Sequence, residues 1–367
     1  MTCDAPIFVS ARFRTGSTML WNLFRHVSGL KCYYEPCHDN LVAHVMGDTP
    51  VQENHRGVTS YWDEYRPLMD DLPAVHKNEF GVCGLFLEAS DRRPELENYL
   101  RFLIDRSRPS RPVLQFNRVD FRLPWLKARF PEARIVHLFR DPRDQWRSMT
   151  RNLPDDRAGN PDENTDYDLV VWAVSLSRTF PFLVGPHIRH SYERHYLLWR
   201  LSYLMGARCA DVSLSYDQDF CKDPARGVVR LIDAVGLPSA AARQLEGVVE
   251  APSRSSRALS LSSSACARME TACDELLERL GLIGRLGVAP LEEIRRDHAS
   301  AWAPFVDGAH EEAVRLSGRT FSLLRSHYLD TVRVLRRLGQ NARNVQDALL
   351  LKEQELRERI ASQARSA

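Results

Sequence analysis

Residues 6–27 read PIFVSARFRTGSTMLWNLFRHV, and this stretch decides the fold. A short run of apolar, partly β-branched residues at 6–10 predicts a buried strand. Further on, apolar residues recur at the spacing that places them on one face of a helix: Leu20, Leu23, Phe24 and Val27. The segment between them, ARFRTGST, contains Gly16 and three hydroxyl residues and predicts a loop. We therefore expect a strand, a loop and a helix in succession.

The loop of this unit has the composition of an anion cradle. Gly16 permits a tight turn, successive backbone N–H groups can then point at one spot, and the helix N-terminus adds positive potential. Arg14 would supply a mobile charge. The GxxxxGK[ST] pattern of nucleotide triphosphatases is absent, because no lysine precedes Ser17 or Thr18. The alternative interpretation is a polar turn in which a serine or threonine caps the helix.

The rest of the chain repeats the strand and helix alternation. Short apolar runs separated by helix-like segments indicate βαβ units around a mostly parallel sheet. These runs are at residues 82–87, 112–116, 134–139 and 210–214. The fold class predicted is α/β, with one domain over residues 1–302 and insertions at 39–77 and 152–206 of the kind that often cover a site.

The C-terminal segment has a different pattern. No proline follows Pro304 for 63 residues, and apolar side chains fill nine of the twelve a/d positions from 321 to 359. This pattern predicts one long helix or a coiled coil within residues 309–367. Such a helix would fold back on the domain, pair with a second copy in a homodimer, or dock another protein.

Composition excludes several classes of protein. The 367 residues have a net charge of +2, which gives no overall field for nucleic acid, and their balance of apolar and charged residues is that of a globular chain. No apolar stretch is long enough to span a membrane. The eight cysteines form no CxxC pairs, so we expect neither a disulfide framework nor a metal site. With a strand predicted almost at the first residue, we expect no leader and a cytoplasmic protein.

A second motif is in residues 136–149, which read VHLFRDPRDQWRSM. The predicted strand ends in Arg140, Asp-Pro turns the chain, and Ser148 follows eight residues after Arg140, about two helical turns on. A guanidinium and a hydroxyl in this arrangement could bind one anion. The alternative is a solvated basic helix start, which is our interpretation of the three neighbouring arginines 143, 147 and 151.

Taken together and in this order, the two motifs resemble those of the sulfotransferases that use 3′-phosphoadenosine 5′-phosphosulfate. RTGST is similar to the family's 5′-phosphosulfate loop, and FRDPRDQWRSM to its 3′-phosphate motif. Residues 214–237, LSYDQDFCKDPARGVVRLIDAVGL, resemble the family's Tyr-Asp/Glu segment. The resemblance covers about residues 5–265 and implies a P-loop-like, three-layer fold around a central, mostly parallel sheet.

The resemblance also implies a nucleotide site. The co-substrate would be 3′-phosphoadenosine 5′-phosphosulfate and the product adenosine 3′,5′-bisphosphate, with no metal. The residues that match the family's binding positions are Arg12, Arg14, Thr15, Gly16, Ser17, Thr18, Arg140, Ser148, Tyr216 and Arg254. Arg254 is part of a serine-rich stretch, residues 253–264, that would also suit an exposed connector.

The implied reaction is an in-line displacement at sulfur by an acceptor hydroxyl, which needs positioning and neutralisation of charge. Arg14 fits the second role. The general base would be Glu35, in a Glu-Pro pair similar to that of carbohydrate-directed members, with His38 as substitute. Glu35 could instead be a helix-end carboxylate in a salt bridge. Asn117 or Arg118 ends a predicted strand where the family often places a basic residue near the sulfuryl group, or else caps the following turn.

The function predicted is therefore transfer of a sulfuryl group to a hydroxyl. We expect the acceptor to be a carbohydrate or glycoconjugate, and a tyrosyl-peptide, lipid-linked or small-metabolite acceptor stays open. This expectation rests on Arg14, on the Glu35-Pro36 pair and on three aromatic residues that could stack on sugar rings, Tyr61, Trp62 and Tyr65. Two alternatives stay open. One is a non-catalytic nucleotide-binding scaffold that presents the C-terminal helix to a partner, and the other is a P-loop kinase, which the missing lysine disfavours.

Overall fold

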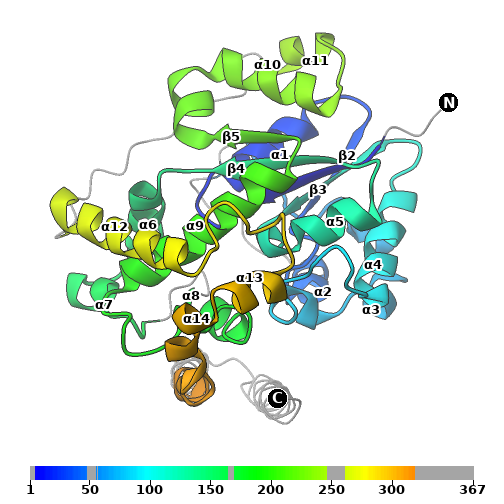
Figure 1. Cartoon of the computed structure of the whole chain (residues 1–367). Coiled ribbons are helices and arrows are strands. Elements are labelled where there is room, and N and C mark those ends of the chain that lie inside the picture. The colour runs from blue at the N-terminus through cyan, green and yellow to red at the C-terminus, as the bar shows by residue number, and fades with distance from the viewer. Residues whose placement is uncertain (1–4, 48–54, 56, 164–168, 246–260, 319–367) are drawn as a thin grey trace, which may run out of the picture.

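A computed structural model describes residues 5–47, 55, 57–163, 169–245 and 261–318 of the chain (Figure 1). Arg254 and the a/d positions from 321 to 359 lie outside the described residues. The sequence-based predictions for them stay predictions.

The described residues contain a five-stranded sheet in the order β2-β3-β1-β4-β5, in which every neighbouring pair is parallel. The strands are β1 (Ile7–Ala11), β2 (Leu30–Tyr34), β3 (Arg111–Phe116), β4 (Arg134–Phe139) and β5 (Val212–Ser215). The helices are α1 (Ser17–Arg25), α2 (Leu41–Met46), α3 (Leu72–Val75), α4 (Pro94–Asp105), α5 (Leu123–Arg129), α6 (Pro142–Thr150), α7 (Asp155–Gly159), α8 (Leu169–Ser175), α9 (Ser191–Cys209), α10 (Pro224–Val235), α11 (Ala240–Gln244), α12 (Ser263–Arg279), α13 (Leu291–Asp297) and α14 (Ala299–Val306).

The helices form a layer on each side of the sheet. Figure 1 shows α10 and α11 on one side, whereas α9 crosses the other side and is covered by α12. Strand β1 lies at the centre and is buried over its whole length, as its apolar sequence predicts. The three-layer α/β fold is thus confirmed. Since all five strands are parallel, the loops after β1, β2, β3 and β4 meet at one edge of the sheet.

The prediction of a strand at residues 82–87 is wrong. Residues 82–87 form an irregular segment, although they read as an apolar run. The buried guanidinium of Arg122 donates hydrogen bonds to the carbonyl groups of Phe80, Cys83 and Gly84, at 2.8, 2.7 and 2.9 Å. These contacts satisfy backbone acceptors that a neighbouring strand would otherwise have to pair. The place at the edge of the sheet is taken by β2, which the sequence did not single out.

The aromatic residues of the 39–77 insertion are part of the core. Tyr61, Trp62 and Tyr65 are 6%, 5% and 0% exposed, and the Tyr61 ring stacks on Tyr34 at 5.0 Å between centroids. The Tyr65 hydroxyl donates to the Tyr34 carbonyl group at 3.0 Å. These rings therefore cover edge strand β2, and the expectation that they stack on sugar rings is wrong.

The packed structure extends beyond the predicted domain end at residue 302. Trp302 lies inside α14, and residues 309–318 form a further helical segment. Leu316 in that segment is fully buried in the same apolar cluster as Trp302. The first turns of the predicted C-terminal helix thus belong to the core. Among the described helices, none is both long enough and apolar enough to cross a membrane.

Candidate active site

The loop between β1 and α1 has the backbone of an anion cradle. Gly16 is the N-cap of α1 with φ of 93°, and Arg14 has φ of 64°. The Thr15 hydroxyl donates to the Arg12 carbonyl group at 2.6 Å, which closes the turn. Within the described residues, no side chain caps the N-terminus of α1. The first amides of a nine-residue helix are thus available to an anionic ligand.

Two residues predicted to bind the cofactor, Arg12 and Thr18, have partners within the protein. The Arg12 guanidinium is buried, forms an ion pair with Asp120 at 2.8 Å and lies over the Trp172 ring at 4.4 Å. The Thr18 hydroxyl is 3.0 Å from the Tyr34 hydroxyl. These contacts hold the loop in place, and the prediction that the two residues bind the cofactor stays a prediction.

The second motif meets this loop. Strand β4 ends at Phe139, and the Asp141 carboxylate caps α6 by accepting from the amides of residues 143 and 144. This cap fixes the start of α6, and Ser148 in that helix contacts the cradle. Arg14 Nε donates to Ser148 Oγ at 2.9 Å, and Arg140 Nη1 donates to the Arg14 carbonyl group at 3.3 Å. Two segments more than 120 residues apart thus form one cationic site, as the order of the motifs predicted.

Tyr216 completes this side of the site. It begins the π-helical turn η5 (Tyr216–Lys222), and its ring lies 5.0 Å from the Arg140 guanidinium carbon. A Cβ atom on Gly16 would lie 2.3 Å from Tyr216 Cδ2, so this position admits only glycine without a rearrangement. Asp217, which the sequence analysis did not single out, accepts from the Asp141 amide at 2.8 Å. The Tyr-Asp pair that it forms with Tyr216 is the feature of the sequence that could have identified it.

The chemistry of these groups fits a ligand with two anionic ends. Nε of Arg140 is buried and has no hydrogen-bond partner among the described residues, and its distance to the Asp217 carboxylate is 3.8 Å. The open amides of α1 offer a second set of donors. No group of histidine, cysteine, aspartate or glutamate side chains in the described chain is arranged to hold a metal.

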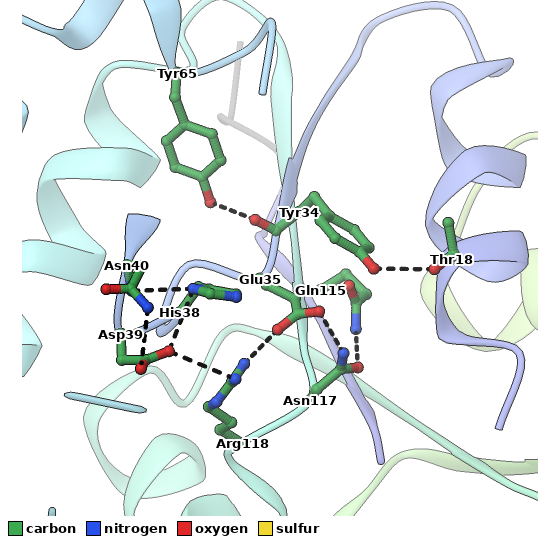
Figure 2. A network of polar contacts seen from close by, with 10 residues as sticks. All are labelled: Thr18, Tyr34, Glu35, His38, Asp39, Asn40, Tyr65, Gln115, Asn117 and Arg118. Atoms are coloured by element: carbon green, nitrogen blue, oxygen red, sulfur yellow. Dashed lines mark hydrogen bonds and ion pairs between the residues drawn. The ribbon is translucent and has the colours of Figure 1, made fainter. Parts of the chain in front are cut away.

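Glu35 lies in a buried polar network at the end of β2 (Figure 2). Asn117 Nδ2 donates to Glu35 Oε1 at 2.6 Å, and Arg118 Nη1 donates to Oε2 in an ion pair. Gln115 Nε2 in turn donates to Asn117 Oδ1 at 2.8 Å. Both candidates at the end of β3 therefore contact Glu35. The salt bridge that the sequence left as an alternative for this carboxylate is present.

Electrostatics separate the two candidate bases. Burial raises the pKa of Glu35, and the charge of Arg118 acts in the opposite direction. Burial and the same Arg118 charge lower the pKa of His38 to about 3. His38 Nδ1 also accepts a hydrogen bond from the Asn40 amide at 3.0 Å. A carboxylate with a raised pKa is the stronger base, so the environment favours Glu35 over His38.

The network around Glu35 adjoins the cradle. The Arg118 guanidinium carbon lies 4.8 Å from the Phe13 ring, and Phe13 precedes Arg14 in the loop. Among the described non-glycine residues, Arg14 and Glu35 are the two that have positive φ, at 64° and 42°. Such backbone strain persists where the surrounding structure fixes it, and it often occurs at functional sites.

The chain is similar to known proteins of one family. A family model described as "Sulfotransferase family" matches residues 6–240. The sulfotransferase domain of the olefin synthase of Synechococcus PCC 7002 is similar at 15% identity, over 74% of this chain and 96% of that domain, with a TM-score of 0.37. The sulfotransferase domain of the curacin biosynthetic pathway is similar at 14% identity, over 82% and 97%, with a TM-score of 0.38. No curated protein matches the chain.

Proposed function

The chain belongs to the sulfotransferase family, and we propose that it transfers a sulfuryl group from 3′-phosphoadenosine 5′-phosphosulfate to an acceptor hydroxyl. The observation that carries this proposal is the meeting of Arg14, Arg140 and Ser148 at an open helix N-terminus, beside a buried carboxylate. The strained backbone at Arg14 and Glu35 independently supports a functional role for these two residues.

The two halves of the site would hold the two ends of the nucleotide. The amides at the start of α1 and the Arg14 guanidinium would bind the phosphosulfate, because they combine fixed donors with a mobile charge. Arg140 and Ser148 would bind the 3′-phosphate, and Tyr216 would form the wall beneath Arg140. The bound co-substrate supplies an electrophilic sulfur and a phosphate leaving group.

Glu35 would accept the proton of the acceptor hydroxyl. The acceptor oxygen forms a bond to sulfur, the bond from sulfur to the 5′-phosphate oxygen breaks, and the hydroxyl proton ends on the Glu35 carboxylate. Arg14 and the α1 amides neutralise the charge that gathers on the departing phosphate. Asn117 and Arg118 hold the two carboxylate oxygens in place, which leaves further lone pairs for the hydroxyl proton.

We propose a carbohydrate or glycoconjugate as the acceptor. This rests on Arg14 and on the Glu35-Pro36 pair, because the aromatic residues that also suggested it are buried in the core. Sulfation assays with a panel of oligosaccharides, tyrosyl peptides and aliphatic alcohols would test the class. Faster turnover of a peptide or a simple alcohol than of every oligosaccharide would contradict a carbohydrate acceptor.

Nucleotide preference tests the function as a whole. We expect adenosine 3′,5′-bisphosphate without magnesium to raise the melting temperature, since a ligand at 100 times its Kd stabilises a protein by about 2.7 kcal/mol. AMP, which lacks the 3′-phosphate, should give a smaller shift. A response to ATP with magnesium but not to the bisphosphate would favour a kinase. No response to either nucleotide would contradict the proposed function.

A further inference from the structure

Arg118 lies between two carboxylates. Its Nη1 donates to Glu35, and its Nη2 is 3.7 Å from Asp39 Oδ1 (Figure 2). The side chains of Arg118 and Glu35 are 5% and 7% exposed, whereas that of Asp39 is 34% exposed. One buried guanidinium thus faces an inner and an outer carboxylate.

This arrangement matters when Glu35 takes up a proton. Protonation removes the charge of the inner carboxylate, but the guanidinium of Arg118 stays charged because arginine does not deprotonate in proteins. A buried cation without a counter-ion is strongly unfavourable. The Asp39 carboxylate, at 3.7 Å, keeps a negative charge beside Arg118 throughout the step.

We propose that Asp39 is a positioning residue that holds the charge of Arg118 while Glu35 is protonated, so that the sharing of Arg118 between the two carboxylates sets the strength of Glu35 as a base. This inference rests on the proposed function of Glu35. It adds a role for Asp39, whose effect on Glu35 is transmitted through Arg118.

Three other groups near Glu35, namely Tyr34, Cys37 and His38, are uncharged near pH 7. Tyr34 on β2 and Cys37 in the following loop face Glu35, and burial raises the pKa of both, that of Cys37 to about 11. His38 Nδ1 is 3.3 Å from Asp39 Oδ1, but its pKa of about 3 leaves the imidazole uncharged.

Three more groups complete these surroundings. His44 and His76 lie beyond His38, and burial lowers the pKa of His76 to about 4. Arg122, whose donors are bound to backbone carbonyl groups, contributes a fixed positive charge beside Cys37. Arg118 and Asp39 are therefore the pair whose charges bear most directly on the titration of Glu35.

The two members of this pair act on Glu35 in opposite directions. When the Asp39 charge is removed, the positive charge of Arg118 interacts with Glu35 alone. The pKa of Glu35 therefore falls, and Glu35 becomes a weaker base. Removal of the Arg118 charge takes away the largest effect that opposes burial, so the pKa of Glu35 rises. A residue with a merely structural role would lower activity without a directed shift of the pH profile.

The test measures kcat/KM against pH for Asp39→Asn, Arg118→Gln and Arg118→Lys. For Asp39→Asn we expect the acid limb to move to lower pH by about half a unit and the plateau of kcat to fall about two- to threefold. For Arg118→Gln we expect the acid limb to move to higher pH by about one unit or more. Arg118→Lys, which keeps the charge, should restore most of the wild-type limb.

Asp71→Asn is the matched control, because Asp71 pairs with Arg106 on the surface of the same region. It should leave the profile unchanged. All four variants should bind adenosine 3′,5′-bisphosphate as the wild type does. Asp39 is partly exposed, so Asp39→Asn tests the proposal even where Arg118→Gln does not fold.

The inference is overturned if Asp39→Asn leaves both the limb and kcat unchanged, or if Asp39→Asn and Arg118→Gln shift the limb in the same direction. A lower plateau with an unmoved limb would also overturn it. Glu35→Gln is measured in parallel. Full activity of that variant would instead remove Glu35 from the proposed function, which is a different failure.

Discussion

Alanine in place of Gly16 should damage the cradle through two separable effects. The φ of 93° at this position is strained for any residue with a Cβ atom. The new Cβ would also lie 2.3 and 2.4 Å from Tyr216 Cδ2 and Cε2, closer than real Cβ contacts. Since Tyr216 packs beneath Arg140, a shift of its ring disturbs both halves of the proposed nucleotide site.

The magnitude follows from these two terms. Left-handed backbone costs alanine about 1–2 kcal/mol, and the overlap with the ring about 1–3 kcal/mol, so Gly16→Ala should lower the free energy of unfolding by about 2–5 kcal/mol. The Kd for adenosine 3′,5′-bisphosphate should rise at least about tenfold, which corresponds to about 1.4 kcal/mol. Urea unfolding followed by tryptophan fluorescence measures the first quantity, and isothermal calorimetry the second.

The variant Gly236→Ala separates the backbone cost from the cost of the overlap with the Tyr216 ring. Gly236 also has positive φ, 68°, at the C-terminus of α10, but among the described residues no atom outside its own stretch of chain lies within 4 Å of the position of its Cβ. It should show only the backbone cost of about 1–2 kcal/mol, with unchanged nucleotide affinity. Combination of Gly16→Ala with Tyr216→Ala should be less destabilising than the sum of the two, by about 1–3 kcal/mol. The reasoning is refuted if Gly16→Ala costs no more than Gly236→Ala and the bisphosphate binds with wild-type affinity.

The further predictions concern the nucleotide, the base and the C-terminus. Arg140→Ala should remove most of the preference for adenosine 3′,5′-bisphosphate over AMP in calorimetric titrations, because it deletes a charge-assisted contact; an unchanged preference would move the 3′-phosphate elsewhere. Glu35→Gln should cut turnover by about 10²–10⁴-fold with bisphosphate affinity retained. Burial raises the pKa of Glu35, so wild-type activity should fall as the pH drops through that raised pKa, and residual activity of the variant should lack this limb. A chain ending at residue 318 should bind the bisphosphate like the full chain, and light scattering of the two will show whether residues 319–367 mediate self-association. A chain ending at Trp302 loses the buried Leu316 and should be less stable in urea by about 2 kcal/mol or more; equal stability would exclude Leu316 from the core.

The sequence by itself was sufficient for the central unit of the fold. The strand, the loop and the helix of residues 6–27 are where the apolar periodicity predicts them, because a buried parallel strand and an amphipathic helix each leave a local pattern. The runs that became β3, β4 and β5 were likewise visible. The pair of motifs around Arg14 and Arg140 was also readable, since each depends on the order of residues within a few positions.

Only the tertiary structure decided which side chains meet. The ion pairs of Arg12 with Asp120 and of Arg118 with Glu35 join residues 108 and 83 positions apart, a separation over which sequence spacing carries no geometric information. The burial of Tyr61 depends in the same way on distant residues that it covers. Arg122 turned an apolar run into irregular backbone, because a buried guanidinium must find acceptors and took the carbonyl groups that a strand would have used. Local patterns therefore determined the elements, and long-range desolvation and charge pairing determined the site.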